Sequence, residues 1–160
     1  MKAGTKFAGQ LLIAVSVVWI GGIRISCFMD NALISGAISV FWMLFILNAI
    51  NFFDNMDGLA VGTSAIAFLF FTIVAGINGQ YLIAALGACS CASACGFWLY
   101  NRNPASIFMG DSGSHFLAFL LGIISSKVTF YNPEIASTRF AILIPLFILA
   151  VPVFDALTVV

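Results

Sequence analysis

Apolar residues run along this chain in long blocks that short polar segments separate. A helix needs about 20 predominantly apolar residues to cross a hydrocarbon core of ~30 Å. The pattern predicts an all-α fold, a single polytopic transmembrane bundle over residues 1–160 with about six spans. The predicted spans are Phe7–Ile23, Ala32–Phe53, Leu59–Ile77, Tyr81–Tyr100, His115–Phe130 and Phe140–Val160.

Composition supports a membrane protein. Hydrophobic residues make up 62% of the chain and charged residues 8%, against about 45–50% and about 25% in soluble domains. The mean hydropathy is +1.15. The formal net charge is zero, so nothing predicts a nucleic-acid partner. We expect the lipid bilayer to surround the bundle.

Two polar segments, residues 48–59 and 101–114, interrupt the apolar pattern and contain three of the six acidic residues. A carboxylate close to a bilayer is costly and marks a functional site by default. Two predicted spans separate Asp57 from Asp111, so both segments should emerge on one membrane face and form one site in the loops. By the same count, Lys2, Lys6 and Asp155 should lie near that face.

The residue types in these segments suit a hard cation and phosphate. Asn51, Asp54 and Asp57 are spaced three apart, so at a helix end neighbouring members share a face. Gly110 and Gly113 flank Asp111 at the predicted start of a helix, where a carboxylate and free backbone N–H groups can meet a phosphate. Mg²⁺ is typically held by one or two protein oxygens and by substrate phosphates. The alternative is a pair of polar loops whose serines cap helices.

The same two segments resemble the two central signatures of the polyprenyl-phosphate N-acetylhexosamine-1-phosphate transferases. That family includes the phospho-MurNAc-pentapeptide transferase and the GlcNAc-1-phosphate transferases that start O-antigen, enterobacterial common antigen and teichoic-acid synthesis. The residues that carry the resemblance are Asn48-Ala-Ile-Asn51-x-x-Asp54-x-x-Asp57-Gly-Leu-Ala and Asn101-x-x-Pro-Ala-x-Ile-Phe-Met-Gly-Asp111-x-Gly-Ser.

The resemblance implies a reaction and a site. A sugar 1-phosphate, which we expect to be GlcNAc 1-phosphate, would pass from a UDP-N-acetylhexosamine to undecaprenyl phosphate with release of UMP. Phosphoryl transfer depends on positioning and charge neutralisation, here by Mg²⁺ or alternatively Mn²⁺. Asp111 and then Asn51 are the implied metal ligands. Asn51, Asp57 and Asn101 are implied to bind substrate, and the implied catalytic acids are Asp54, Asp57 and Asp111.

The resemblance also implies a location, the bacterial inner membrane with the site facing the cytoplasm. Counting positive charges does not choose an orientation, because Lys2, Lys6 and Arg102 on the motif face balance three on the other, Arg24, Lys127 and Arg139. A homodimer is an open alternative.

The chain departs from the family at both ends. The family carries an Asp-Asp motif upstream and a His-containing loop downstream, and neither occurs here. The chain therefore resembles the central part of a family member, and we expect it to be inactive by itself and to regain activity with the flanking segments.

Other residues receive structural interpretations. His115, the only histidine, follows Gly113-Ser114 at a predicted helix start and is interpreted as a cap-region or phosphate-proximal residue. Gly87, Cys91 and Cys95 recur every four residues, which is the spacing of close helix packing, so a metal or disulfide role for the cysteines is not favoured.

Three other classes of protein are alternatives to a transferase. A secondary transporter needs acids near the middle of a span, whereas these lie at span ends. A phosphatidyltransferase that uses a CDP-alcohol should show Asp-Gly-x-x-Ala-Arg, which is absent from the sequence. A non-catalytic membrane fragment stays open.

Overall fold

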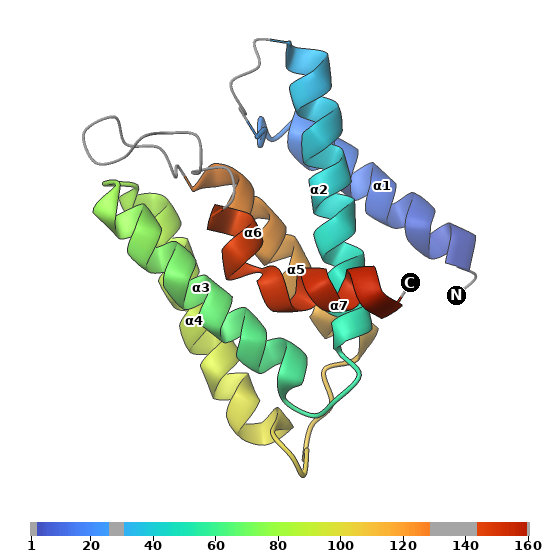
Figure 1. Cartoon of the computed structure of the whole chain (residues 1–160), viewed down its shortest axis with the longest axis vertical. Helices are drawn as coiled ribbons and strands as arrows, with labels where there is room; N and C mark the ends of the chain where they lie inside the picture. Colours follow the sequence, from blue (N-terminus) through green and yellow to red (C-terminus); the bar gives the residue numbers. More distant parts are fainter. Residues whose placement is uncertain (1–2, 26–30, 129–143, 160) are drawn as a thin grey trace.

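A computed structural model describes residues 3–25, 31–128 and 144–159 of the chain. All regular secondary structure within these residues is helical, which confirms the predicted all-α fold (Figure 1). The helices are α1 (Ala3–Trp19), α2 (Ala32–Phe53), α3 (Leu59–Ile77), α4 (Tyr81–Asn101), α5 (Gly110–Lys127), α6 (Ile144–Ile148) and α7 (Ala150–Val159).

Three of these helices, α2, α3 and α4, are long and apolar enough to cross a membrane. Helix α1 is apolar but shorter. The total of about six spans stays a prediction. Helices α2 and α3 have the predicted bounds. Asn31 caps α2 by accepting the backbone N–H groups of Leu33 and Ile34. Helix α3 begins after Gly58, whose φ is +74°, and ends before Asn78.

Helix α5 begins earlier than predicted, at Gly110 instead of His115. Its first turn holds Asp111, Ser112 and Ser114, whose polarity excluded them from the predicted apolar span. A carboxylate is favourable at the positive end of a helix dipole, so this polar turn continues the helix outward.

The last predicted span, Phe140–Val160, is not one continuous helix. Its first four residues and Val160 lie outside the described part of the chain, and residues 144–159 form α6 and α7, which meet at Leu149. Pro152 explains the break, since proline has no backbone N–H and its ring clashes with the carbonyl of the residue four positions earlier, here Ile148.

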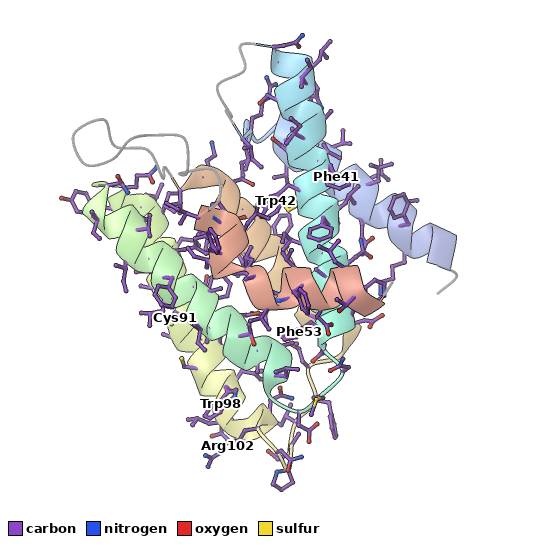
Figure 2. All side chains as sticks on the ribbon, viewed as in Figure 1. Phe41, Trp42, Phe53, Cys91, Trp98 and Arg102 are labelled. Carbon is purple, nitrogen blue, oxygen red and sulfur yellow. The ribbon has the colours of Figure 1, made fainter. Side chains whose placement is uncertain are left out.

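The helices pack as two groups that meet at α5 (Figure 1). Helix α3 lies along α4, α2 packs on both α1 and α5, and α7 crosses α2. The largest fully buried side chains include Phe68, Phe71 and Met43. Trp42, on α2, donates its indole N–H to Ser125 Oγ of α5 at 2.9 Å (Figure 2).

Two of the small residues of α4, Gly87 and Cys91, pack on α3, in agreement with the close packing predicted from their spacing, whereas Cys95 is exposed. A Cβ at Gly87 would lie 2.5 Å from Thr72 Oγ1, and the Cys91 thiol is 3.4 Å from the Ala65 carbonyl oxygen (Figure 2). Helices without a hydrophobic driving force between them associate through such close packing.

The α2–α3 and α4–α5 connections lie at the same end of the bundle, at the bottom of Figure 1, which confirms that both polar segments share one face. At the other end, the Lys127 ammonium donates to the carbonyl of Gly22. Lys2 and Arg139 are outside the described residues. Asp155 lies on α7 with Oδ2 buried and without a recorded hydrogen bond in the described part of the chain; its predicted place near the motif face stays a prediction.

Candidate functional site

The centre of the site is a contact between the last turn of α2 and the first turn of α5. The Asn51 side-chain amide donates to Asp111 Oδ1 at 3.2 Å and to Ser114 Oγ at 2.9 Å. Ser114 is fully buried, whereas the Asp111 side chain is 77% exposed. Asn51 therefore joins a buried anchor to a carboxylate that is open to a ligand.

Helix α1 adds a cation to this contact. The Lys6 ammonium donates to Asn51 Oδ1 at 2.8 Å and to Asp111 Oδ2 at 3.2 Å. The Lys6 ammonium thus bridges one oxygen each of Asn51 and Asp111, the two residues that were predicted to bind a metal. The sequence placed Lys6 on this face but did not assign it to the site. The only sequence feature that marks this side of the helix is the pair Lys6 and Gln10, two polar residues one helical turn apart in an apolar segment.

The charges around Asp111 act in opposite directions on two carboxyl groups. Hydrogen bonds from Asn51 and Lys6, with the charge of Lys6, hold the pKa of Asp111 below its usual value. Partial burial, with the nearby negative charge of Asp111, raises the pKa of Asp54. The two shifts indicate that the carboxylates of Asp54 and Asp111 lie close enough to interact, and that the Lys6 ammonium favours the ionised form of Asp111.

A second group of contacts holds the two loops together. Asn101 is only 4% exposed, and its Oδ1 accepts the Gly58 N–H at 3.1 Å while its amide donates to the Ile107 carbonyl at 2.9 Å. Asp57 Oδ2 accepts the backbone N–H of Ala105 at 3.1 Å. These two side chains fix the α2–α3 loop against the α4–α5 loop.

Gly58 allows this close approach because its φ of +74° is a conformation that favours glycine. A Cβ there would lie 3.0 Å from Arg102 Cα and 3.2 Å from Trp98 Nε1. Arg102 lies over the Trp98 ring at 5.8 Å from its centroid, at the loop end of α4 (Figure 2).

A polar network lies beside Lys6, between α1, α2 and α5. Gln10, which is 6% exposed, places its amide nitrogen 2.8 Å from His115 Nε2. The side-chain amides of Gln10 and Asn48 also form a pair, in which each nitrogen donates to the oxygen of the other at 3.4 Å. His115 Nδ1 is 2.6 Å from the Asp111 carbonyl oxygen. Sequence reasoning did not foresee this network, although it placed His115 close to the site.

The oxygens around Asp111 suit Mg²⁺. They belong to carboxylate and amide groups, which are hard ligands, and the Lys6 ammonium already occupies a position between two of them. Within the described part of the chain, no three His, Cys, Asp or Glu side chains gather as a metal cluster. A cation here would therefore keep coordination positions for water or substrate phosphate, as Mg²⁺ commonly does.

The structure therefore groups the predicted site residues in two sets. Asn51 and Asp111 are in direct contact, and the charge of Asp111 reaches Asp54. Asp57 and Asn101 bind loop backbone instead. The roles in metal binding, substrate binding and catalysis stay predictions.

The fold and the site define an all-helical membrane protein with an oxygen-rich end that holds the Lys6 ammonium. Residues 1–129 match the model of glycosyl transferase family 4, and the chain belongs to this family.

Curated relatives agree with the family. The chain is 36% identical to a probable undecaprenyl-phosphate N-acetylglucosaminyl 1-phosphate transferase of Bacillus subtilis (strain 168), over 97% of this chain and 44% of the relative. It is 37% identical to the phospho-N-acetylmuramoyl-pentapeptide-transferase of Bacillus cytotoxicus, over 68% and 37%, and 30% identical to that of Lactobacillus gasseri, over 83% and 44%. The chain thus spans less than half the length of these relatives.

Proposed function

We propose that this chain carries the metal- and donor-binding part of an enzyme that transfers a sugar 1-phosphate from a UDP-sugar to undecaprenyl phosphate and releases UMP. The observation that carries the proposal is the convergence of Asn51, Asp111 and the Lys6 ammonium at the end of the bundle where both polar loops lie. Family membership and the named relatives support the same reaction class.

The reaction needs a place where two anionic reactants can meet. An oxygen of the lipid phosphate attacks the sugar-linked phosphorus of the donor, the bond to the bridging oxygen breaks, and UMP leaves with that oxygen. Both reactants carry negative charge, so positioning and charge neutralisation dominate catalysis. A site at the end of a transmembrane bundle lets a soluble donor meet a lipid acceptor.

The residues of this chain divide that work. Asp111 and Asn51 would hold Mg²⁺, which when bound supplies charge neutralisation to the phosphates. The Lys6 ammonium, released from its present partners, is within reach of the same position and can bind a phosphate oxygen. Asp54 adds a second carboxylate, whose pKa is raised by partial burial and by the negative charge of Asp111. Asp57 and Asn101 hold the two loops together beside the place where the nucleotide-sugar would bind.

GlcNAc 1-phosphate is the transferred group that we favour, because the relative with this specificity in its name aligns over 97% of the chain. Phospho-MurNAc-pentapeptide transfer is the second candidate, since two relatives named for it align over 68% and 83% of the chain. We place the enzyme in the bacterial inner membrane, with the loops of Asn51 and Asp111 facing the cytoplasm, where nucleotide-sugars are made.

The test is a transfer assay on a joined protein, in which this chain is fused in frame to the segments that its Bacillus subtilis relative has outside the matched region. Membranes with the joined protein receive undecaprenyl phosphate, Mg²⁺ and either radiolabelled UDP-GlcNAc or UDP-MurNAc-pentapeptide, and lipid-linked product and UMP are measured. We expect product from UDP-GlcNAc. Asp111→Asn should lower the rate at least about a hundredfold at an unchanged protein level, because a group that stabilises the transition-state charge is lost.

Two controls make the result decisive. Asn55→Ala changes an exposed loop residue and should keep the wild-type rate. The chain without the added segments should insert in the membrane and give no product. Product from UDP-MurNAc-pentapeptide alone would select the second candidate. Absence of product from both donors, or a wild-type rate for Asp111→Asn, would refute the proposal.

A further inference from the structure

We propose that His115 is a positioning residue, which acts as its neutral Nδ1–H tautomer to fix the first turn of α5, and with it Asp111, against α1. The value of this device to catalysis rests on the proposed function. The tautomer and its hydrogen bonds do not, and they can be measured separately.

The first step concerns the Nδ1 side of the ring. His115 Nδ1 lies 2.6 Å from the carbonyl oxygen of Asp111. A carbonyl oxygen only accepts hydrogen bonds, so Nδ1 carries the proton. The Ser114 hydroxyl donates to the same carbonyl oxygen at 3.2 Å, which accepts in both contacts.

The second step concerns the Nε2 side. In a neutral imidazole with a proton on Nδ1, Nε2 is an acceptor. The group 2.8 Å from it is the amide nitrogen of Gln10, which is a donor. The two sides of the ring therefore require the same tautomer independently.

The orientation of the Gln10 amide is itself fixed by a neighbour. Asn48 donates its amide N–H to the Leu44 carbonyl at 2.8 Å, which sets which end of its own amide is nitrogen. Its remaining N–H faces Gln10 Oε1, and its oxygen faces Gln10 Nε2. Turning the Gln10 amide over would place nitrogen against nitrogen and oxygen against oxygen in this pair, so the nitrogen of Gln10 stays towards His115.

The network has a consequence for Asp111. Lys6 and Gln10 are one turn apart on α1, and Asp111 and His115 are one turn apart on α5. The pairs Lys6–Asp111 and Gln10–His115 are thus two parallel side-chain links between the helices. A ligand that draws Lys6 away from Asp111 leaves the His115 link to hold the α5 turn in place.

The decisive measurement is ¹⁵N NMR of the chain in lipid bilayers. The sequence has one histidine, so ¹⁵N-histidine labelling with a histidine-free affinity tag reports His115 alone. The spectra are recorded at about pH 8.5, where free imidazole is neutral. We expect a protonated Nδ1 and an unprotonated Nε2. A protonated Nε2 with a bare Nδ1, the tautomer that free histidine in water favours, would overturn the proposal.

A variant tests the partner. Gln10→Glu replaces the donor opposite Nε2 with an acceptor of similar shape, so Nε2 should gain a proton in the same spectrum. Ser16→Ala, on the same helix and outside the network, should leave the wild-type tautomer unchanged. If Nε2 stays unprotonated in Gln10→Glu, Gln10 is not the partner and the link is refuted.

The positioning role is tested by Mn²⁺ affinity, measured from the loss of the free-ion EPR signal. His115→Leu removes both hydrogen bonds and should weaken Mn²⁺ binding about 10- to 100-fold, the usual effect of losing a group that orients a metal ligand. His115→Asn keeps a side-chain N–H close to the former Nδ1 and should recover most of that loss. Equal binding by wild type and His115→Leu would overturn the positioning role. If wild type itself binds no Mn²⁺, the proposed function and this role fail, and the NMR result still decides the tautomer.

Discussion

Asn101→Ala is predicted to release the α4–α5 loop from the α2–α3 loop. Asn101 is 4% exposed. Its side-chain oxygen accepts the N–H of Gly58, and its side-chain nitrogen donates to the carbonyl of Ile107. Alanine removes both bonds and adds no clash. The substitution therefore measures how much the two hydrogen bonds of Asn101 stabilise the contact between the two loops.

The size of the effect follows from the burial of the two partners. The bond to Gly58 is buried, so its N–H is left without a partner, at about 1–3 kcal/mol. The bond to Ile107 is partly buried, so water can replace it and its loss should cost only the net value of about 0.5–1.5 kcal/mol. Together these give about 1.5–4.5 kcal/mol, or roughly 10- to 1,500-fold in the opening equilibrium, since about 1.4 kcal/mol is tenfold.

Trypsin cleavage after Arg102 measures this opening, because Arg102 is the exposed residue next to Asn101 and cleavage of a rapidly opening segment follows the open population. Protein in nanodiscs is digested, and the new end at Asn103 is quantified by mass spectrometry. An unfolded peptide of the loop, with and without the substitution, corrects for the intrinsic preference of trypsin. Asn55→Ala is the matched control. Equal corrected rates for Asn101→Ala and Asn55→Ala would refute the reasoning.

Three further predictions follow from single contacts. Lys6→Met should raise Mn²⁺ affinity by a few-fold at most, because the exposed Lys6–Asp111 ion pair no longer competes for the metal oxygens; weaker binding in an equilibrium titration would contradict this. Gly58→Ala should lower the unfolding free energy in mixed micelles by about 1–3 kcal/mol, because φ is +74° and a Cβ meets Arg102, whereas Gly4→Ala, which meets nothing, should not. Cysteines placed at Asn55 and Ser106, in a background without native cysteines, should react with an impermeant thiol reagent from the same side only; labelling from opposite sides would exclude a single site.

Most of the fold follows from hydropathy, and its one large departure has a local cause. The blocks that became α2 and α3 end at polar residues, so their bounds could be predicted from sequence. An average over a window treats residues 140–160 as one apolar block, and it does not register that Pro152 removes a backbone donor. The observed break at Leu149 is a property of backbone geometry, which composition does not contain.

The site was predictable only in part, for a similar reason. The contact of Asn51 with Asp111 could be expected, because motif order and span count place both on one face. Lys6 was interpreted only as a topology marker, since its position one turn before Gln10 marks a polar stripe on the helix but does not identify partners in α2 and α5. Asn101 was expected to bind substrate, but the backbone groups that engage it become visible only when two loops are placed together.

The central claim is that Asn51 and Asp111 hold a divalent cation that touches the donor phosphates. Pulsed EPR of Mn²⁺ bound to the joined protein tests it most directly, because phosphorus in the coordination shell of Mn²⁺ gives a ³¹P coupling. With UDP-GlcNAc present, we predict a ³¹P coupling in the wild type and in Asn55→Ala, and its loss in Asp111→Asn. Bound Mn²⁺ without ³¹P coupling in the wild type, or an unchanged coupling in Asp111→Asn, would contradict the claim.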